Sequence, residues 1–299
     1  MKKTASSFLL LILAVNASAK EKMLPLSESA ASSLAGKSLV VTRHEKPAFT
    51  AMTAGKAMFG LFGAGAMVVA GNKIISENQV ADPAEIFERE LVPALSKRYG
   101  FVVSAAPSPI ITETKPAKIA ATQTDTDYIL DIRSGGWMFA YEATNWDKYW
   151  LMYSVQIQLI DAKSGALVSN MGCNAGNQKD PNAPTRDAIL ANQAALLKDI
   201  TQGFGWTCAH LLAKEQFHLA ESELNPTPAQ YGDVLAKYAA AQSGPSANPA
   251  VVSTEVSPAS AETQTTVAAP AADETSGPET APVESEAPAA TESPVSAGQ

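Results

Sequence analysis

Strict alternation of apolar and polar side chains marks residues 149–161 as a long β-strand. The apolar positions are Leu151, Tyr153, Val155, Ile157 and Leu159. The intervening positions become more polar toward Gln156 and Gln158, so we expect that face of the strand to meet water. A glycine-containing turn at 161–165 and an apolar return at 166–170 follow. The sequence therefore predicts a long β-hairpin with one buried face.

Apolar residues that recur every three to four positions predict two main helices. The first covers about 83–99, between an Asp-Pro start signal and the stop signal Gly100. The second covers about 184–217, and we expect Gly203 and Gly205 to interrupt it.

Shorter β-rich runs complete the predicted order of elements. They lie at 38–43, 101–104, 128–133 and 137–141. Strands that precede, separate and follow the helices are typical of a mixed sheet covered by helices. We therefore expect an α/β (α+β) fold, with a mixed sheet, a long hairpin and two main helices packed on it.

The first nineteen residues have the three parts of a secretory signal peptide. Lys2 and Lys3 precede an apolar run at 8–15, and Ala17–Ala19 fits a small-residue cleavage site. The run is shorter than the roughly 20 residues that span a bilayer. We expect cleavage after Ala19 and a periplasmic or secreted protein.

Charge and composition divide the remainder into two parts. Residues 20–223 carry 19 basic and 21 acidic residues, whereas residues 224–299 carry one basic and nine acidic residues. The first part has the size of one folded domain, and its weak charge argues against nucleic acid as a partner. The second part is rich in Pro, Ala, Ser, Thr and Glu, and we expect it to be disordered from about 241. Residues 224–240 leave open a short amphipathic turn.

Cys173 and Cys208 are the two cysteines of the chain. In an exported protein a disulfide is the natural interpretation, since the compartment is oxidising. A metal site with His210 and His218 is the alternative, but the spacing fits no standard zinc pattern. We expect neither a metal nor a cofactor.

Aromatic residues in the segment 137–150 are the best candidate for a binding surface. Trp146 and Trp150, with Tyr149 and Asn145 beside them, are suited to stacking on sugar rings or to docking a peptide. Packing within a sheet uses the same residue types, so a structural role stays open.

The uncharged run 57–71 is rich in glycine and alanine. Small residues allow close helix approach, and this favours a helix packed under the domain. Peripheral membrane contact or self-association through this run is the alternative, so an oligomer is possible.

Residues 125–132 read Asp-Thr-Asp-Tyr-Ile-Leu-Asp-Ile and lead into a strand, and residues 153–169 form the predicted hairpin. These two segments resemble the periplasmic domain of the curli secretion channel subunit and related bacterial envelope assembly proteins. The resemblance extends over about 38–218 and implies the fold and a non-catalytic assembly role, without any functional residue. The chain lacks the lipobox cysteine of the lipoproteins in this group, so we expect a soluble protein.

No catalytic motif surrounds His44, His210 or His218, and Asp127 and Asp131 are typical of solvated turn and edge carboxylates. The leading hypothesis is an exported, non-catalytic binding or assembly module for secretion or cell-wall machinery, with an envelope protein as partner. One alternative is a periplasmic carbohydrate- or peptide-binding enzyme that uses 137–150. The other is a membrane-associating protein that uses 57–71.

Overall fold

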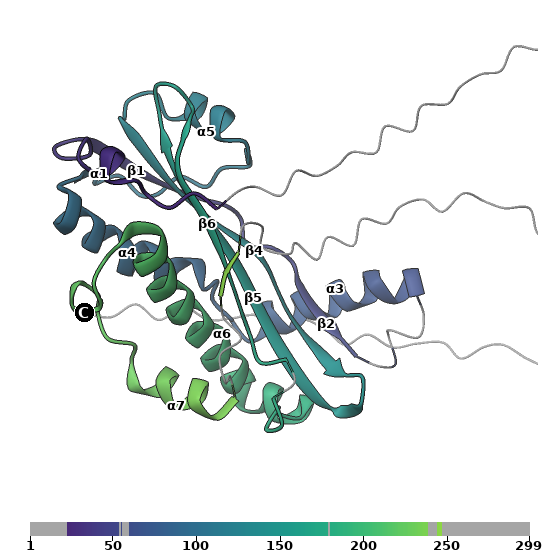
Figure 1. Ribbon diagram of the computed structural model, residues 1–299. Helices are drawn as coiled ribbons and strands as arrows, with labels where there is room; N and C mark the ends of the chain where they lie inside the picture. The colour runs from purple at the N-terminus through teal and green to yellow at the C-terminus, as the bar shows by residue number, and fades with distance from the viewer. Residues whose placement is uncertain (1–22, 54, 56–59, 179, 239–243, 247–299) are drawn as a thin grey trace, which may run out of the picture. The chain divides into compact units, whose positions relative to one another are not determined.

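The computed structural model describes residues 23–53, 55, 60–178, 180–238 and 244–246 (Figure 1). The signal peptide predicted at 1–19 and the tail beyond 246 lie outside the described residues. The strands are β1 (Ser38–Arg43), β2 (Phe49–Met52), β3 (Val102–Val103), β4 (Tyr128–Glu142), β5 (Asn145–Asp161), β6 (Leu167–Gly176) and β7 (Gly244–Ser246). The helices are α1 (Glu28–Ala31), α3 (Gly60–Glu77), α4 (Ala84–Tyr99), α5 (Pro116–Thr122), α6 (Arg186–Phe217), the 3-10 turn η1 (Glu221–Glu223) and α7 (Ala229–Tyr238).

The described strands form one mixed sheet in the order β3-β1-β4-β5-β6-β7. β1 pairs parallel with the first half of β4, and β2 pairs parallel with its second half. β5 and β6 pair antiparallel, as the hairpin pattern predicts, and β4 pairs antiparallel with β5 on the other side. The predicted fold class, a mixed sheet with a long hairpin and two main helices, is confirmed.

The main core lies between one face of the sheet and the helices α4 and α6 (Figure 1). The apolar set of β5 predicted by alternation is fully buried there. Ile119 and Ala120 of α5 cover one end of the opposite face, against Ile129 and Ile160. Helices therefore lie on both faces of the sheet, but most of the helical packing is on one of them.

The prediction that Gln156 and Gln158 meet water is wrong, because each is only 1% exposed. The side-chain amides of both glutamines donate to Oδ1 of Asn170 on β6, at 3.0 and 3.4 Å. Arg133 of β4 bonds Gln156 from the other side. Hydrogen bonds between neighbouring strands replace the water that the alternation pattern suggested.

Helix α4 is confirmed at both ends. Gly100 has a φ of 73°, the left-handed conformation of a helix stop, and its N–H donates to Ser96. Oδ1 of Asp82 accepts from the N–H of Ala84 at 2.9 Å and caps the start of the helix. Pro93 lies inside the helix.

Helix α6 is interrupted, as predicted, but the break does not lie at Gly203 and Gly205, where the sequence placed it. Residues 191–194 leave the helical conformation, and Asn192, Gln193 and Ala194 have φ values between 51° and 56°. Gly203 and Gly205 stay helical because they serve packing. A Cβ at Gly203 would lie 3.0 Å from Leu235 of α7, and one at Gly205 would lie 2.7 Å from Ile86 of α4.

Cys173 of β6 and Cys208 of α6 form the predicted disulfide, with a Cα–Cα distance of 5.6 Å. Both residues are fully buried in the main core. Helix α7 also packs on α6 through Tyr231, Val234 and Leu235. These residues lie beyond 223, where composition placed the end of the folded part. The amphipathic turn left open within 224–240 is thus the packed helix α7, Ala229–Tyr238.

Candidate functional site

The aromatic segment predicted as a binding surface is divided by the pleat of the sheet. Tyr149 is only 6% exposed, and its ring packs edge-on against Phe139 at 5.6 Å. Trp137 packs in the same way against Phe49. These two aromatic residues have the structural role that the sequence left open.

Trp146 lies at the turn of the β4–β5 hairpin and is 61% exposed. Its ring contacts Tyr141 edge-on at 6.4 Å, and its indole N–H donates to the carbonyl of Ala143 at 3.2 Å. Tyr141 is the cross-strand partner of Tyr149, so the two side chains share one face of the hairpin, the face that packs on the core. Trp146 contacts that face through Tyr141.

Trp150 points to the opposite face of the sheet, where its cross-strand partner is Ala140. It lines a hollow of about 110 Å³ together with Met152, Asn174 and Gly176. The ring is partly exposed and forms one wall of that hollow.

Asn145 and Lys148 line a second hollow of about 290 Å³, with Glu142 and Asp180. Lys148 and Trp150 are alternate residues of β5 and share a face of the strand, although the two hollows have no lining residue in common. We call the pair the hairpin-end groove. Its polar and aromatic lining residues are Glu142, Asn145, Lys148, Trp150, Asn174 and Asp180. Of the predicted site residues, the structure brings Asn145 and Trp150 together here and leaves Tyr149 and Trp146 outside.

Two buried polar atoms of the groove-lining residues have no hydrogen-bond partner among the described residues, Oδ1 of Asn174 and Oδ2 of Asp180. Nδ2 of the buried Asn177, which lines neither hollow, also has none. The other side-chain atoms of Asn177 and Asp180 are used: Oδ1 of Asn177 accepts from the N–H of Leu151 at 2.6 Å, and Oδ1 of Asp180 accepts from Asn182. A buried polar atom without a partner costs free energy, so such atoms mark a place where a polar ligand would be stabilising.

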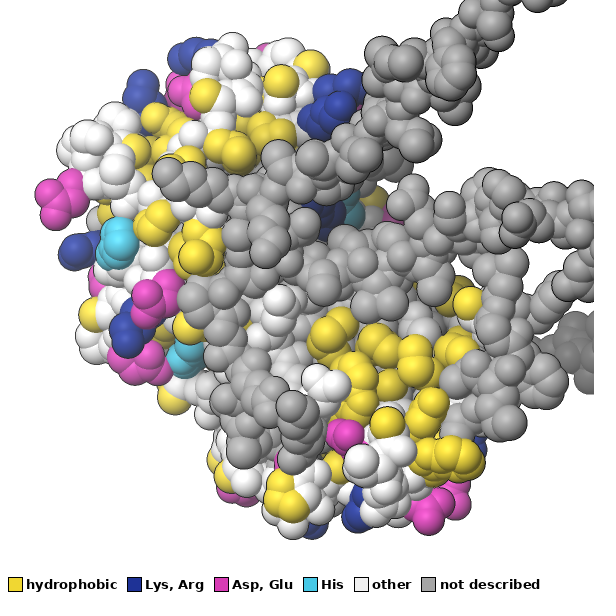
Figure 2. Space-filling model, turned by 45° about the vertical axis from the view of Figure 1, so that its right-hand side comes forward, with side chains coloured by type: hydrophobic (Ala, Val, Ile, Leu, Met, Phe, Trp, Pro, Cys, Tyr) yellow, Lys and Arg dark blue, Asp and Glu magenta, His cyan; other side chains and the backbone are white. Residues whose placement is uncertain are grey.

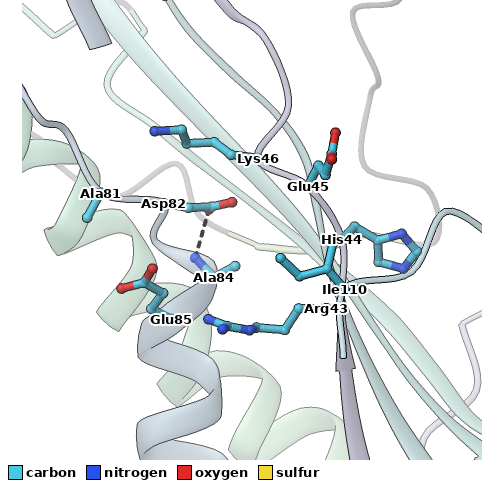
Figure 3. A pocket seen from close by; sticks show the side chains of 9 residues that line it. All are labelled: Arg43, His44, Glu45, Lys46, Ala81, Asp82, Ala84, Glu85 and Ile110. Carbon is cyan, nitrogen blue, oxygen red and sulfur yellow. Dashed lines mark hydrogen bonds between the residues drawn. The ribbon is translucent and has the colours of Figure 1, made fainter. Parts of the chain in front are cut away.

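A different pocket, of about 300 Å³, lies between the β1–β2 connection and the start of α4 (Figure 3). Arg43 and Lys46 bring positive charge to it, and Asp82 and Glu85 bring carboxyl groups. Figure 3 shows the ring of His44 pointing away from Asp82.

The two basic side chains of this second pocket already have partners within the chain. Arg43 pairs with Glu88 at 3.2 Å. Lys46 donates to the carbonyl of Val80 at 3.2 Å and lies over the ring of Trp137. We take the hairpin-end groove, which has an aromatic wall, as the candidate ligand site.

Asp82 ends a buried chain of hydrogen bonds behind the second pocket. Ser134 donates to its Oδ1 at 2.7 Å, and the hydroxyl groups of Ser134 and Tyr153 lie 3.0 Å apart. Burial raises the pKa of the Asp82 carboxyl, although the hydrogen bonds from Ser134 and Ala84 oppose that effect. Sequence reasoning missed this chain because only the fold brings β4, β5 and the start of α4 together.

The described histidines are used in internal hydrogen bonds. His44 and Thr42 both contact the same oxygen of Asp131, at 2.9 and 2.7 Å. The carboxylate of Asp131 therefore lies between Thr42 and His44. In a catalytic triad it is the histidine that lies between the nucleophile and the carboxylate. His210 contacts Glu221 and the carbonyl of Asn225, and His218 contacts the carbonyl of Leu26. In the part of the chain that the structure describes, no three His, Cys, Asp or Glu side chains gather as metal ligands.

The glycine-rich run 57–71 forms the first part of α3, with 57–59 outside the described residues. Gly71 lies against β2, where a Cβ would be 1.9 Å from the carbonyl oxygen of Phe49. Val69 is 72% exposed, and hydrophobic side chains gather on the face seen in Figure 2. Among the helices of the described residues, none combines the length and the apolar character needed to cross a bilayer.

No protein-family model matches the sequence, and no curated protein matches it significantly. The similarity to solved structures is at a low level. Lipoprotein GNA1162 from Neisseria meningitidis has 16% identity and a TM-score of 0.20, over 47% of this chain and 82% of that chain. The PelC dodecamer from Paraburkholderia phytofirmans has 14% identity and a TM-score of 0.25, over 65% and 94%. A point variant of the same dodecamer, in a second crystal form, has 15% identity and a TM-score of 0.24, over 61% and 91%. Likenesses of this size carry no inference about function.

Proposed function

We propose that this protein is an exported, non-catalytic binding module of the bacterial cell envelope, and that it binds through the hairpin-end groove. The observation that carries the proposal is the groove itself. Trp150, Asn145 and Lys148 line it, and buried polar atoms of Asn174 and Asp180 have no partner among the described residues. Such a mixture of one aromatic ring and several hydrogen-bonding groups is typical of ligand sites.

Export is supported by two independent features. The start of the chain has the basic, apolar and small-residue segments of a signal peptide. The buried Cys173–Cys208 disulfide is the form that cysteines take in an oxidising compartment.

A non-catalytic role is supported by how the titratable groups are used. His44, His210 and His218 contact carboxylates or carbonyl groups of the chain itself. The hydroxyl of Ser134 donates to the Asp82 carboxyl and lies 3.0 Å from the hydroxyl of Tyr153, so it is engaged in an internal hydrogen-bond chain.

The test follows the full-length chain in bacterial cells. We expect mass spectrometry of the purified product to find a chain that begins at Lys20 with oxidised cysteines. On a native gel of the envelope fraction we expect a complex that a Trp150→Ala variant fails to form and that a Trp146→Ala variant retains. An unprocessed chain with reduced cysteines would contradict export. Turnover of a cell-wall substrate by the purified protein would contradict the non-catalytic role.

A further inference from the structure

We infer that the hairpin-end groove binds a neutral saccharide chain, an inference that rests on the proposed function and names the ligand class of the same site. Trp150 supplies a flat, partly exposed ring in one hollow. The C–H groups on one face of a pyranose ring carry slight positive charge, and they pack against the negative face of an aromatic ring.

The unpartnered atoms of the groove match the edge of a sugar ring. Asn174 offers a buried acceptor in the hollow that Trp150 lines, and Asp180 offers a second acceptor in the other hollow. A sugar hydroxyl both donates and accepts a hydrogen bond, so a row of hydroxyl groups satisfies donors and acceptors alike. Lys148 and Asn145 extend the polar lining into the second hollow.

The position of the groove in the sheet argues against an extended peptide. The groove lies on the face of β5, which is hydrogen-bonded to β4 on one side and to β6 on the other. A peptide that adds a strand needs a free sheet edge, and β5 is a central strand. The ligand is therefore held by side chains, as a saccharide is.

The charges of the groove argue for a neutral ligand. Glu142 and Asp180 place carboxyl groups in the same hollow as Lys148. A phosphate-bearing chain would meet repulsion from these carboxylates, whereas sugar hydroxyls donate to carboxylates and accept from the lysine ammonium.

The test titrates the purified mature chain with two neutral β-1,4-linked probes, chitotetraose and cellotetraose. Binding is followed by tryptophan fluorescence and by saturation-transfer NMR. We expect saturable binding of at least one probe. Trp150→Ala and Asn174→Ala should weaken it by at least about tenfold. The matched control Trp146→Ala should change the affinity by less than about twofold, because that indole contacts Tyr141 instead.

Thermal unfolding of each variant checks the fold, and Asn174→Ala decides alone if Trp150→Ala unfolds. The inference is overturned if neither probe binds at about 10 mM, a concentration that detects even weak ligands. It is also overturned if both variants bind like the parent protein, or if an uncharged tetrapeptide binds in place of the saccharides. If the protein binds neither saccharide probe but still forms the complex in the envelope fraction, the result refutes this inference alone and does not contradict the proposed function.

Discussion

The backbone of α3 approaches β2 most closely at Gly71. A Cβ there would lie 1.9 Å from the carbonyl oxygen of Phe49 and 3.0 Å from the nitrogen of Ala51. Two residues of backbone, rather than a flexible side-chain end, would have to move. Oδ1 of Asn72 also accepts from the N–H of Phe49 at 2.9 Å, and that bond depends on the same close approach.

We predict that Gly71→Ala lowers the free energy of unfolding by about 3 kcal/mol, the upper part of the range for overpacked sites. The matched control is Gly65→Ala in the same helix. No atom lies within 4 Å of a Cβ at Gly65, so alanine should stabilise by up to about 1 kcal/mol through helix propensity. Urea unfolding of both variants measures the difference. Equal effects would mean that α3 does not pack on β2 through Gly71.

Gln193 is an exposed residue in the left-handed conformation, with a φ of 56°. That conformation costs a residue with a side chain about 1–2 kcal/mol, and glycine avoids most of the cost. We predict that Gln193→Gly stabilises the protein by about 1 kcal/mol. Lys198→Gly, in the regular part of α6, should instead destabilise by about 1 kcal/mol. If both glycines destabilise alike in urea unfolding, the break at 191–194 is absent in solution.

Asp82 gives a dependence of stability on pH with a definite sign. Burial raises the pKa of its carboxyl in the folded chain, so the folded state holds the proton more tightly than the unfolded state does. This contribution to stability is present below the unfolded pKa of about 3.9 and is lost as the pH rises through the folded pKa. Asp127 and Asp161 have lowered pKa values and act in the opposite direction.

We therefore predict that Asp82→Asn, compared with the parent protein, gains stability as the pH rises from acid toward neutral. Asparagine keeps the Oδ1 acceptor for Ser134 and Ala84 and cannot ionise. Chemical unfolding at a series of pH values gives the difference between the two proteins. A constant difference from pH 3 to pH 7 would show that the Asp82 carboxyl has an ordinary pKa.

The strands β1, β3, β4, β5 and β6 and the helix α4 were predictable because local signals agree with the tertiary structure, whereas β2 and β7 were not predicted. In β5 the alternating positions Leu151 to Leu159 are all buried, and in α4 Gly100 has the left-handed φ that a stop signal requires. The break in α6 was misplaced for the opposite reason. Gly203 and Gly205 are helical because α7 and α4 pack against them, and no local pattern reports that contact.

The disulfide joins two elements that meet only in the folded state. Cys173 of β6 and Cys208 of α6 are 35 residues apart in sequence. Closing a loop of that size in the unfolded chain stabilises the fold by about 4 kcal/mol in the chain-entropy estimate.

We predict that the double variant Cys173→Ala, Cys208→Ala loses about 4 kcal/mol of unfolding free energy or slightly more, since two buried sulfurs are also removed. Reduction with dithiothreitol should lower the stability of the parent protein by a comparable amount and leave the double variant unchanged. A parent protein that does not respond to reduction after full unfolding and refolding would contradict the pairing.

The candidate groove was predictable only in part. Asn145 and Trp150 stand in one aromatic segment, and that segment drew attention to them in the sequence. Asn174 comes from β6, and only the antiparallel pairing of β5 with β6 brings it to Trp150. Asp180 comes from the loop that follows β6 and reaches the hollow of Asn145. The alternation of β5 already places Tyr149 on the face of Leu151 and Tyr153, so its burial agrees with the period-two pattern, although the residue type alone fits core packing and ligand binding equally.

Together, the signal-peptide pattern at the start of the chain, the buried disulfide and the polar groove with one aromatic wall support the proposal of an exported binding module. The competing surface is α3, whose Val69 is 72% exposed and whose glycine-rich start suggested membrane contact. The two surfaces predict different neighbours in the cell, so a measurement made in the cell separates them.

The decisive measurement is photocrosslinking in living bacteria, with a photoreactive phenylalanine at position 145, at position 69 or at the exposed control position Ser33. We predict a specific envelope component, protein or glycan, crosslinked from position 145 and neither from position 69 nor from position 33. The product should vanish when the apolar run 8–15 is disrupted and export is blocked. Crosslinks from position 69 to lipid, with none from position 145, would contradict the account.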